Sequence, residues 1–263
     1  KYQITKMSQI KSVHLKAYVQ NLIAQKRKPS YINGIIKTWR AWFRYCVEEE
    51  ILESNPVLRI KWQKEGKTII QTFSDDEVKR LLEAFPYGTY LDTRNNLIIS
   101  LAFDTGARNT EICDIKNDDV NGILLIHGKG NKERNVPITP ILRKKMFRYE
   151  RLKDLYFSDK VVHCDNYLLS RSGRALTKEA VEQIFNKANE IAQCRPEIRC
   201  SPHPARHYYA QFNLRQGLDV YSLSRLLGHE SINITKRYLQ SLQDEQILDL
   251  AVKTSPLSNL KIK

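Results

Sequence analysis

The sequence has little of what cysteine chemistry or a membrane anchor requires. Its five cysteines are odd in number and scattered, with no C-x-x-C pair, among 263 residues. This argues against a disulfide framework and against a cysteine-rich zinc site. No stretch approaches the ~18–20 apolar residues of a membrane span, and no signal-peptide pattern is present. We therefore expect a protein of a reducing cytoplasm, with no metal, no cofactor and no membrane partner.

Acidic residues are in the minority. The chain has 29 Asp and Glu against 43 Lys and Arg, which gives a formal net charge of +14. A surplus of this size points to a polyanion as partner. The excess is most concentrated over residues 1–65, which hold 13 basic and five acidic residues. Composition alone is equally well explained by a solvated basic surface.

The apolar pattern divides the chain into a short helical segment and a longer mixed one. Apolar residues recur at helical spacing over 11–26 and over 29–47, and a weakly periodic stretch follows. We predict a helical domain over 1–63 and a linker over 64–72. A larger domain is predicted over 73–263, with a helix in its C-terminal tail.

The longer segment combines helix and sheet. A capping box at Ser74 predicts the start of a helix, and the apolar run 95–103 fits a buried helix or a buried strand. The β-rich runs 122–127 and 134–138 flank a glycine-containing loop, which predicts a hairpin. The segment 167–169 is a candidate third strand. The expected fold class is mainly α with a small antiparallel sheet (α+β).

Several polar residues lie where neither helix nor hairpin structure requires them, and each has an ordinary explanation by itself. Arg108 and Glu111 could form a surface ion pair at i,i+3 spacing. Lys129 could serve solubility in its loop, and His229 could cap a helix. Lys129 lies in a Gly-Lys-Gly run, but the GxxxxGK[ST] pattern of a phosphate-binding P-loop is absent. Nucleotide hydrolysis therefore loses its main support.

The order of these residues is more informative than any one of them. The chain reads Arg-x-x-Glu, Gly-Lys-Gly, His-x-x-Arg-His, Leu-Leu-Gly-His and then Tyr. This set resembles the tyrosine recombinases, or phage-type integrases, from Ser74 to Tyr238. The most specific stretches are LLGHESINITKRYL (226–239) and GKGNKERNVPI (128–138). The resemblance implies these catalytic residues: Arg108, Lys129, His203, Arg206, His229 and Tyr238.

The residue types suit the transfer of a DNA phosphodiester. The guanidinium groups of Arg108 and Arg206 can hold the non-bridging oxygens bidentately and stay protonated at any working pH. His229 can donate a further hydrogen bond as negative charge develops on the phosphorane. The resemblance also implies a helical core-binding domain before the catalytic domain, and a C-shaped clamp of the two on DNA.

The proton transfers can be assigned in the same way. Tyr238 offers a phenol as nucleophile, and His203 is the candidate acceptor of its proton. Lys129 is the candidate general acid for the departing 5′ oxygen. Glu111 and His207 are expected to support these groups. The resemblance implies a 3′-phosphotyrosine link, which conserves bond energy and requires neither ATP nor a metal.

DNA contacts are expected from the basic residues of the first domain, which would bind phosphate and lose affinity in salt. These residues are Lys26, Arg27, Lys28, Lys37, Arg40 and Arg44. The tail after Tyr238 is expected, by resemblance, to dock into a neighbouring protomer and so link a tetramer on paired sites. Packing against its own domain explains the tail pattern equally well. Accessory DNA-bending proteins are further candidate partners.

We predict a site-specific recombinase that acts on double-stranded DNA in a prokaryotic cytoplasm, on the nucleoid, and integrates or excises a mobile element or resolves DNA sites. A relaxing topoisomerase or a telomere resolvase would share the nucleophile. A DNA-binding regulator with a degenerate site is the alternative from another class. The sequence leaves open the target, the direction, the host element, accessory proteins, and whether an arm-binding module precedes Lys1.

Overall fold

The computed structural model describes residues 4–66, 70–128, 130, 132–242 and 244–254. Lys129, the candidate general acid, lies outside the described residues. The chain forms two compact units, which we call unit 1 (Lys1–Thr68) and unit 2 (Ile69–Lys263).

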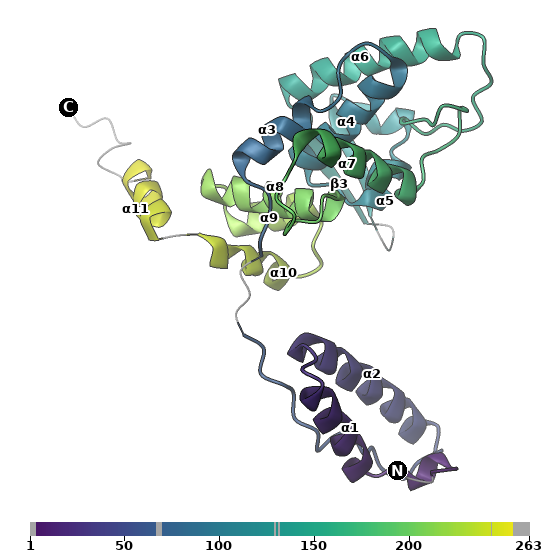
Figure 1. Ribbon diagram of the computed structural model, residues 1–263, viewed down its shortest axis with the longest axis vertical. Coiled ribbons are helices and arrows are strands. Elements are labelled where there is room, and N and C mark those ends of the chain that lie inside the picture. Colours follow the sequence, from purple (N-terminus) through teal and green to yellow (C-terminus); the bar gives the residue numbers. More distant parts are fainter. Residues whose placement is uncertain (1–3, 67–69, 129, 131, 243, 255–263) are drawn as a thin grey trace. The chain divides into compact units, whose positions relative to one another are not determined.

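Over residues 4–66, unit 1 contains two helices, α1 (Ser12–Ala24) and α2 (Pro29–Glu48), after a short 3-10 turn, η1 (Met7–Gln9) (Figure 1). Pro29 is the first residue of α2, where its missing N–H costs no helical hydrogen bond. The apolar faces of both helices form one core, with Ile36 fully buried. The predicted helical nature of this segment is confirmed.

Unit 2 is mainly helical, and α4 is its central element (Figure 1). Its helices are α3 (Asp75–Glu83), α4 (Tyr90–Thr105), α5 (Asn109–Asp114), α6 (Pro140–Phe157), α7 (Lys178–Ala192), α8 (Pro202–Arg215), α9 (Val220–Leu227), α10 (Ile232–Lys236) and α11 (Asp244–Lys253). Two 3-10 turns, η2 (Asn117–Asp119) and η3 (Arg237–Ser241), complete the set in the described part. The capping box predicted for α3 is confirmed, because Ser74 Oγ accepts from the Glu77 backbone N–H and the Glu77 carboxylate accepts from the Ser74 N–H.

The sheet is small and antiparallel, with strand order β1-β2-β3. Its strands are β1 (Val120–Asn121), β2 (Ile123–Gly128) and β3 (Lys132–Pro137), so the predicted hairpin is confirmed. The third strand predicted at 167–169 is wrong, since β1 takes that place. Tyr167 to Leu169 are buried as a loop, in which the Tyr149 hydroxyl donates to the Tyr167 carbonyl. The predicted fold class, mainly α with a small antiparallel sheet, is confirmed.

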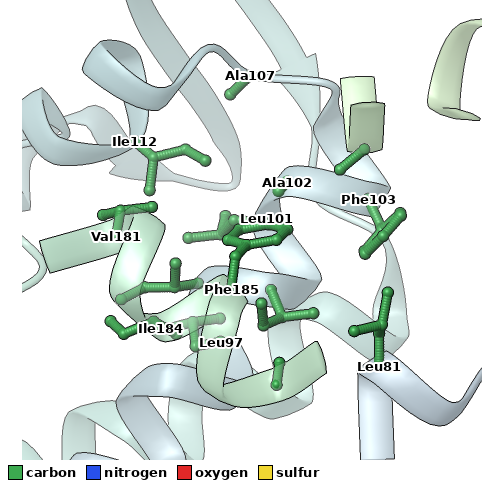
Figure 2. Packing of buried hydrophobic residues seen from close by; sticks show 14 of the residues in the cluster. Leu81, Leu97, Leu101, Ala102, Phe103, Ala107, Ile112, Val181, Ile184 and Phe185 are labelled. Carbon is green, nitrogen blue, oxygen red and sulfur yellow. The ribbon is translucent and has the colours of Figure 1, made fainter. Parts of the chain in front are cut away.

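The core of unit 2 surrounds α4, whose apolar residues face every direction. Leu97, Ile98 and Leu101 are fully buried, as expected for a helix enclosed on all sides. Phe185 of α7 lies next to Leu101 in Figure 2. The apolar run 95–103 is therefore a buried helix, which resolves the choice between helix and strand.

The end of α4 directs the chain into the candidate site. Gly106 is the residue after the helix, in the left-handed region at φ 62°. A Cβ atom there would lie 2.6 Å from the ring of Tyr209. Only glycine fits this turn without strain. The turn places Arg108 at the start of α5.

Candidate active site

A cavity of about 510 Å³ lies in unit 2 where the start of α5, the start of α8, the end of α9 and η3 meet. The predicted catalytic residues of the described part line it together: Arg108, His203, Arg206, His229 and Tyr238. They come from the start of α5, the start of α8, the residue after Gly228 and η3, a span of 130 residues that only the folded unit brings to one place.

Arg108 is half-exposed and is held on one side by its own helix turn. Its Nη1 donates to Glu111 Oε1 at 2.6 Å, and its backbone N–H donates to Glu111 Oε2 at 2.7 Å. Its Nη2 contacts the Gly228 carbonyl at 3.4 Å. The side chain is 41% exposed, so the guanidinium has an open face for an anion.

Arg134 is a site residue that the sequence reasoning missed. Its Nη1 and Nη2 donate to the two oxygens of Glu111 at 2.9 and 2.7 Å, and its Nε donates to the Leu226 carbonyl at 2.7 Å. The side chain is only 9% exposed. The signal was available, because in a strand Arg134 shares a face with the apolar Val136 two residues on.

Glu111 is thereby shared between two arginines. Burial would raise the pKa of this carboxyl, but the hydrogen bonds and charges of Arg134 and Arg108 outweigh burial and lower the pKa to about 2. Glu111 is therefore ionised at neutral pH. It connects β3 of the hairpin with the start of α5.

Arg206 is buried, with 4% of its surface exposed. Its Nη1 donates to the Gly106 carbonyl at 2.7 Å and its Nη2 to the Leu227 carbonyl at 2.6 Å. Both acceptors are at C-terminal ends of helices, α4 and α9, where carbonyls lack helical partners and the helix dipole favours a cation. Burial, and then the charge of Arg108, lowers the pKa of Arg206 to about 10, so it remains a cation at neutral pH.

His229 follows the C-terminal glycine of α9 and lines the cavity. Its Nδ1 lies 2.7 Å from Oγ1 of Thr235, which is fully buried in α10. Burial, followed by the charges of Arg206 and Arg108, lowers the pKa of His229 to about 4. The imidazole is therefore neutral at pH 7.

Tyr238 lies in η3 and is 3% exposed. Its hydroxyl is 2.7 Å from Nδ1 of His207, one turn along α8 from His203. Burial raises the pKa of Tyr238, and the positive charges of Arg206 and Arg237 oppose this only in part. The phenol is therefore protonated in the free protein.

The two histidines of α8 differ in their contact with Tyr238, for which the sequence suggested His203 as the candidate proton acceptor. His207 is bonded to Tyr238, whereas His203 is exposed and its ring centroid lies 4.2 Å from that of His207. Burial, and then the neighbouring His203, lowers the pKa of His207 to about 4. Residues one helical turn apart share a face, so spacing alone could not say which ring meets the tyrosine.

A second cavity, of about 1170 Å³, lies between the β2–β3 hairpin and the end of α9. It shares Arg108 and His229 with the first cavity and also includes Lys132 and Arg225. A basic groove therefore leads from the hairpin to the cavity of Tyr238.

The basic residues predicted to bind DNA in unit 1 differ in the contacts that their side chains make within the protein. Arg40 is the most engaged of them, because its guanidinium donates to the Ile60 carbonyl at 3.0 Å and lies 4.6 Å from the Trp62 ring. Arg44 makes a surface ion pair with Glu48 at 3.6 Å. The others are exposed: Lys26, Arg27, Lys28 and Lys37.

In the described part of the chain, no three His, Cys, Asp or Glu side chains gather as a metal site would need. No helix in that part is long and apolar enough to cross a membrane.

The sequence profile of the phage integrase family matches residues 71–245. The chain therefore belongs to this family, the tyrosine recombinases, which are DNA strand-exchange enzymes. It is 28% identical over 246 residues to the tyrosine recombinase XerC of Anoxybacillus flavithermus, which covers 92% of this chain and 81% of the relative. With XerC of Halalkalibacterium halodurans it shares 30% identity over 233 residues, covering 86% of this chain and 76% of that protein. It is thus a XerC-like enzyme of site-specific recombination.

Solved structures show the same fold. The XerH site-specific recombinase bound to a palindromic difH substrate matches with a TM-score of 0.75 and 21% identity, over 94% of this chain and 73% of that one. A lambda integrase (75–356) dimer bound to a COC′ core site matches with a TM-score of 0.68 and 17% identity, over 90% of this chain and 82% of that one.

Proposed function

We propose that Tyr238 is the nucleophile of this recombinase and that recombination proceeds through a 3′-phosphotyrosine intermediate. The observation that supports this most directly is the cavity in which Arg108, Arg206, His203 and His229 surround the same space as Tyr238. Because the chain belongs to the phage integrase family, we take its substrate to be a phosphodiester of duplex DNA.

The cavity suits a pentavalent phosphorane. Arg206 is fixed by two carbonyls and Arg108 by Glu111, so their charges are in place before the substrate arrives. Preorganised donors of this kind act most strongly on charge that develops in the transition state. The neutral ring of His229 adds a hydrogen bond to a non-bridging oxygen.

The reaction is a balanced transesterification. Tyr238 Oη bonds to phosphorus, the bond from phosphorus to the 5′ oxygen breaks, and the phenol proton moves to His207, its hydrogen-bond partner at 2.7 Å. Lys129 supplies the proton for the 5′ oxygen. A 5′ hydroxyl of the partner strand then attacks the phosphotyrosine and restores the phenol. One ester bond replaces another in each step, so no ATP is consumed.

The tail supports assembly on DNA. Ile247, Leu248 and Val252 of α11 are 50%, 66% and 68% exposed, whereas Leu250 approaches Gly217 of the same unit. Packing within the unit thus uses one part of the helix and leaves the rest in water. We propose that this exposed apolar surface docks on a neighbouring protomer, that four protomers join two DNA sites, and that accessory DNA-bending proteins assist.

In the cell, the proposed reaction integrates or excises a mobile element, or resolves repeated sites, on DNA in the cytoplasm. The basic surface of unit 1 and the groove of unit 2 would each bind backbone phosphates of the DNA site. The C-shaped clamp, and the division into a core-binding and a catalytic domain, stay predictions in this proposal.

The test is a suicide substrate. A duplex site is first selected from random DNA by binding to the protein. A nick is then placed close to the scissile phosphate, so that the short fragment released by cleavage diffuses away and cannot be rejoined. We expect a covalent protein–DNA adduct at the 3′ phosphate. Tyr238→Phe should bind the site with unchanged affinity and form no adduct. Tyr221→Phe, at an exposed tyrosine of α9, is the matched control and should cleave like wild type.

The outcomes separate the alternatives. An adduct followed by strand exchange between two sites supports a recombinase, whereas an adduct that only relaxes supercoils indicates a topoisomerase. DNA binding without any adduct indicates a regulator and overturns the proposal. An adduct formed by Tyr238→Phe would remove this tyrosine from its role.

A further inference from the structure

The hydrogen bond between His229 and Thr235 has a consequence for the proton on the imidazole. Nδ1 of His229 and Oγ1 of Thr235 are 2.7 Å apart. Thr235 is fully buried in α10, three residues before Tyr238. With Nδ1 engaged, Nε2 is the ring nitrogen that remains for the substrate.

A neutral imidazole carries a single N–H, so its two nitrogens have opposite roles. If the proton is on Nδ1, that atom donates to threonine and Nε2 offers a lone pair. Such an Nε2 would repel a phosphate oxygen. If the proton is on Nε2, that atom can donate to the phosphate while Nδ1 accepts from threonine. Only the second tautomer, with the proton on Nε2, can donate a hydrogen bond to a phosphate in the cavity.

The threonine decides between these tautomers. Its hydroxyl has one proton, and within the described part of the chain His229 is its only hydrogen-bond partner. A fully buried hydroxyl whose proton lacks an acceptor is costly. The favourable arrangement is therefore donation from Thr235 Oγ1 to Nδ1, which leaves the ring proton on Nε2.

The surroundings keep the ring in the neutral form to which this argument applies. Burial and the charges of Arg206, Arg108 and Arg134, together with His207, all lower the pKa of His229. These groups come from the segments packed around the ring.

We propose that Thr235 is a positioning residue that fixes His229 as the Nε2-protonated tautomer, so that a neutral ring donates a hydrogen bond to the anionic phosphate. The substrate in this statement rests on the proposed function. The tautomer is a property of the free protein and can be measured without DNA.

The first test reads the tautomer directly. The protein is labelled with ¹⁵N-histidine, and long-range proton–nitrogen spectra are recorded at pH 7, with the His229 signals assigned by their loss in His229→Gln. We expect the Nε2–H pattern in the wild type and in Thr235→Ser, and a mixture or the Nδ1–H pattern in Thr235→Val. Thr235→Val preserves the shape of the side chain, and thermal melting checks that the variant folds.

The second test separates tautomer control from packing that merely places Tyr238. In single-turnover cleavage, Thr235→Val should be slower by about 10- to 100-fold, less than the roughly 10²–10³-fold that loss of a whole donor causes. Thr235→Ser should be close to wild type. The side-chain amide of Gln in His229→Gln always carries N–H donors, so it has no tautomer for Thr235 to control. In that background Thr235→Val should therefore change the rate by less than about threefold, which is the non-additivity expected of two coupled residues.

Each result bears on the inference. An Nδ1–H ring in the wild type, or an unchanged ring in Thr235→Val, overturns it even if the protein cleaves DNA. A full additional loss from Thr235→Val in the His229→Gln background shows a packing role and also overturns it. The proposed function can also fail by itself. If the His229 ring carries its proton on Nε2 and this depends on Thr235, but the protein forms no adduct with DNA, the tautomer inference stands and only the proposed function is wrong.

Discussion

The two units of the chain carry their positive charge in different ways. In unit 1, Lys37 and the Lys26–Lys28 stretch are exposed. In unit 2, Arg206 and Arg134 are buried and donate to fixed oxygen atoms. Exposed charges attract a polyanion at long range and are screened by salt, whereas buried charges act at short range with little screening. Affinity for DNA and chemistry on DNA should therefore respond to different substitutions.

The largest effect is expected at the buried cation of unit 2. Arg206→Lys retains the charge but cannot reach both the Gly106 and Leu227 carbonyls. We expect adduct formation to fall by about 10³-fold. Stability should fall by roughly 2–4 kcal/mol, because a buried carbonyl loses its donor. Single-turnover cleavage and urea unfolding measure the two effects.

The control for this substitution is Arg174→Lys, at an exposed arginine of the same unit. It should change neither measurement by more than the experimental scatter. If Arg206→Lys cleaved DNA at the wild-type rate, the buried guanidinium would not be needed for cleavage, and the proposed difference in role between buried and exposed cations would be wrong.

A smaller effect is expected from the shared carboxylate. Glu111→Gln should reduce cleavage by about 10²-fold, because Arg108 loses its anchor. The pKa of Glu111 is lowered to about 2, so its ionisation stabilises the fold fully above about pH 4.5 and progressively less as the pH falls toward 2. The variant should lose on the order of 2–3 kcal/mol at pH 7, and this deficit should shrink in acid. Urea unfolding at several pH values measures it.

Glu77→Gln is a matched control, because the hydrogen bond from Arg195 lowers the pKa of Glu77 to about 2 as well. Glu77 is not among the residues that line either cavity. This variant should show acid-dependent destabilisation without a comparable loss of cleavage rate. Equal losses of cleavage in both variants would show that Glu111 acts only through stability.

The smallest effect is expected in unit 1. Lys37→Ala should weaken DNA binding a few-fold and reduce the slope of log affinity against log salt by about 0.9, the value for one phosphate contact. Arg40→Ala should leave that slope nearly unchanged and lower stability by about 1–2 kcal/mol, because the Ile60 carbonyl and the Trp62 ring lose a partner. Binding titrations at several salt concentrations measure the slope. An unchanged slope in Lys37→Ala would show that this exposed charge does not contact DNA.

The sequence predicted the elements whose signals are local. The capping box at Ser74 and the hairpin are of this kind, since neighbouring residues decide both. The run 95–103 could not be assigned, because a helix enclosed on all sides has no polar face to reveal its period. The segment 167–169 was misassigned for a related reason, since a buried loop also reads as apolar.

The candidate site shows the same limit. The order of the motifs predicted which residues would meet, and those in the described part do line one cavity. The partners within that cavity depend on packing over more than 20 residues of sequence. Arg134 reaches Leu226, and His207 reaches Tyr238. No local pattern records these two pairings, so the contact of His207 with Tyr238 was not predicted. Arg134 had a local signal in its strand that was not used, and the contact of Thr235 with His229 spans only six residues but depends on the turn after α9.

The pair of carbonyls bound by Arg206 also has a consequence during synthesis. The Gly106 and Leu227 carbonyls lie at the ends of helices separated by more than 100 residues of chain. A nascent chain therefore has no completed cavity until α9 and η3 have left the ribosome and docked on α4 and α8. Growing chains should therefore be unable to cleave DNA, and two inactive fragments divided between α6 and α7 should regain cleavage only on reassociation.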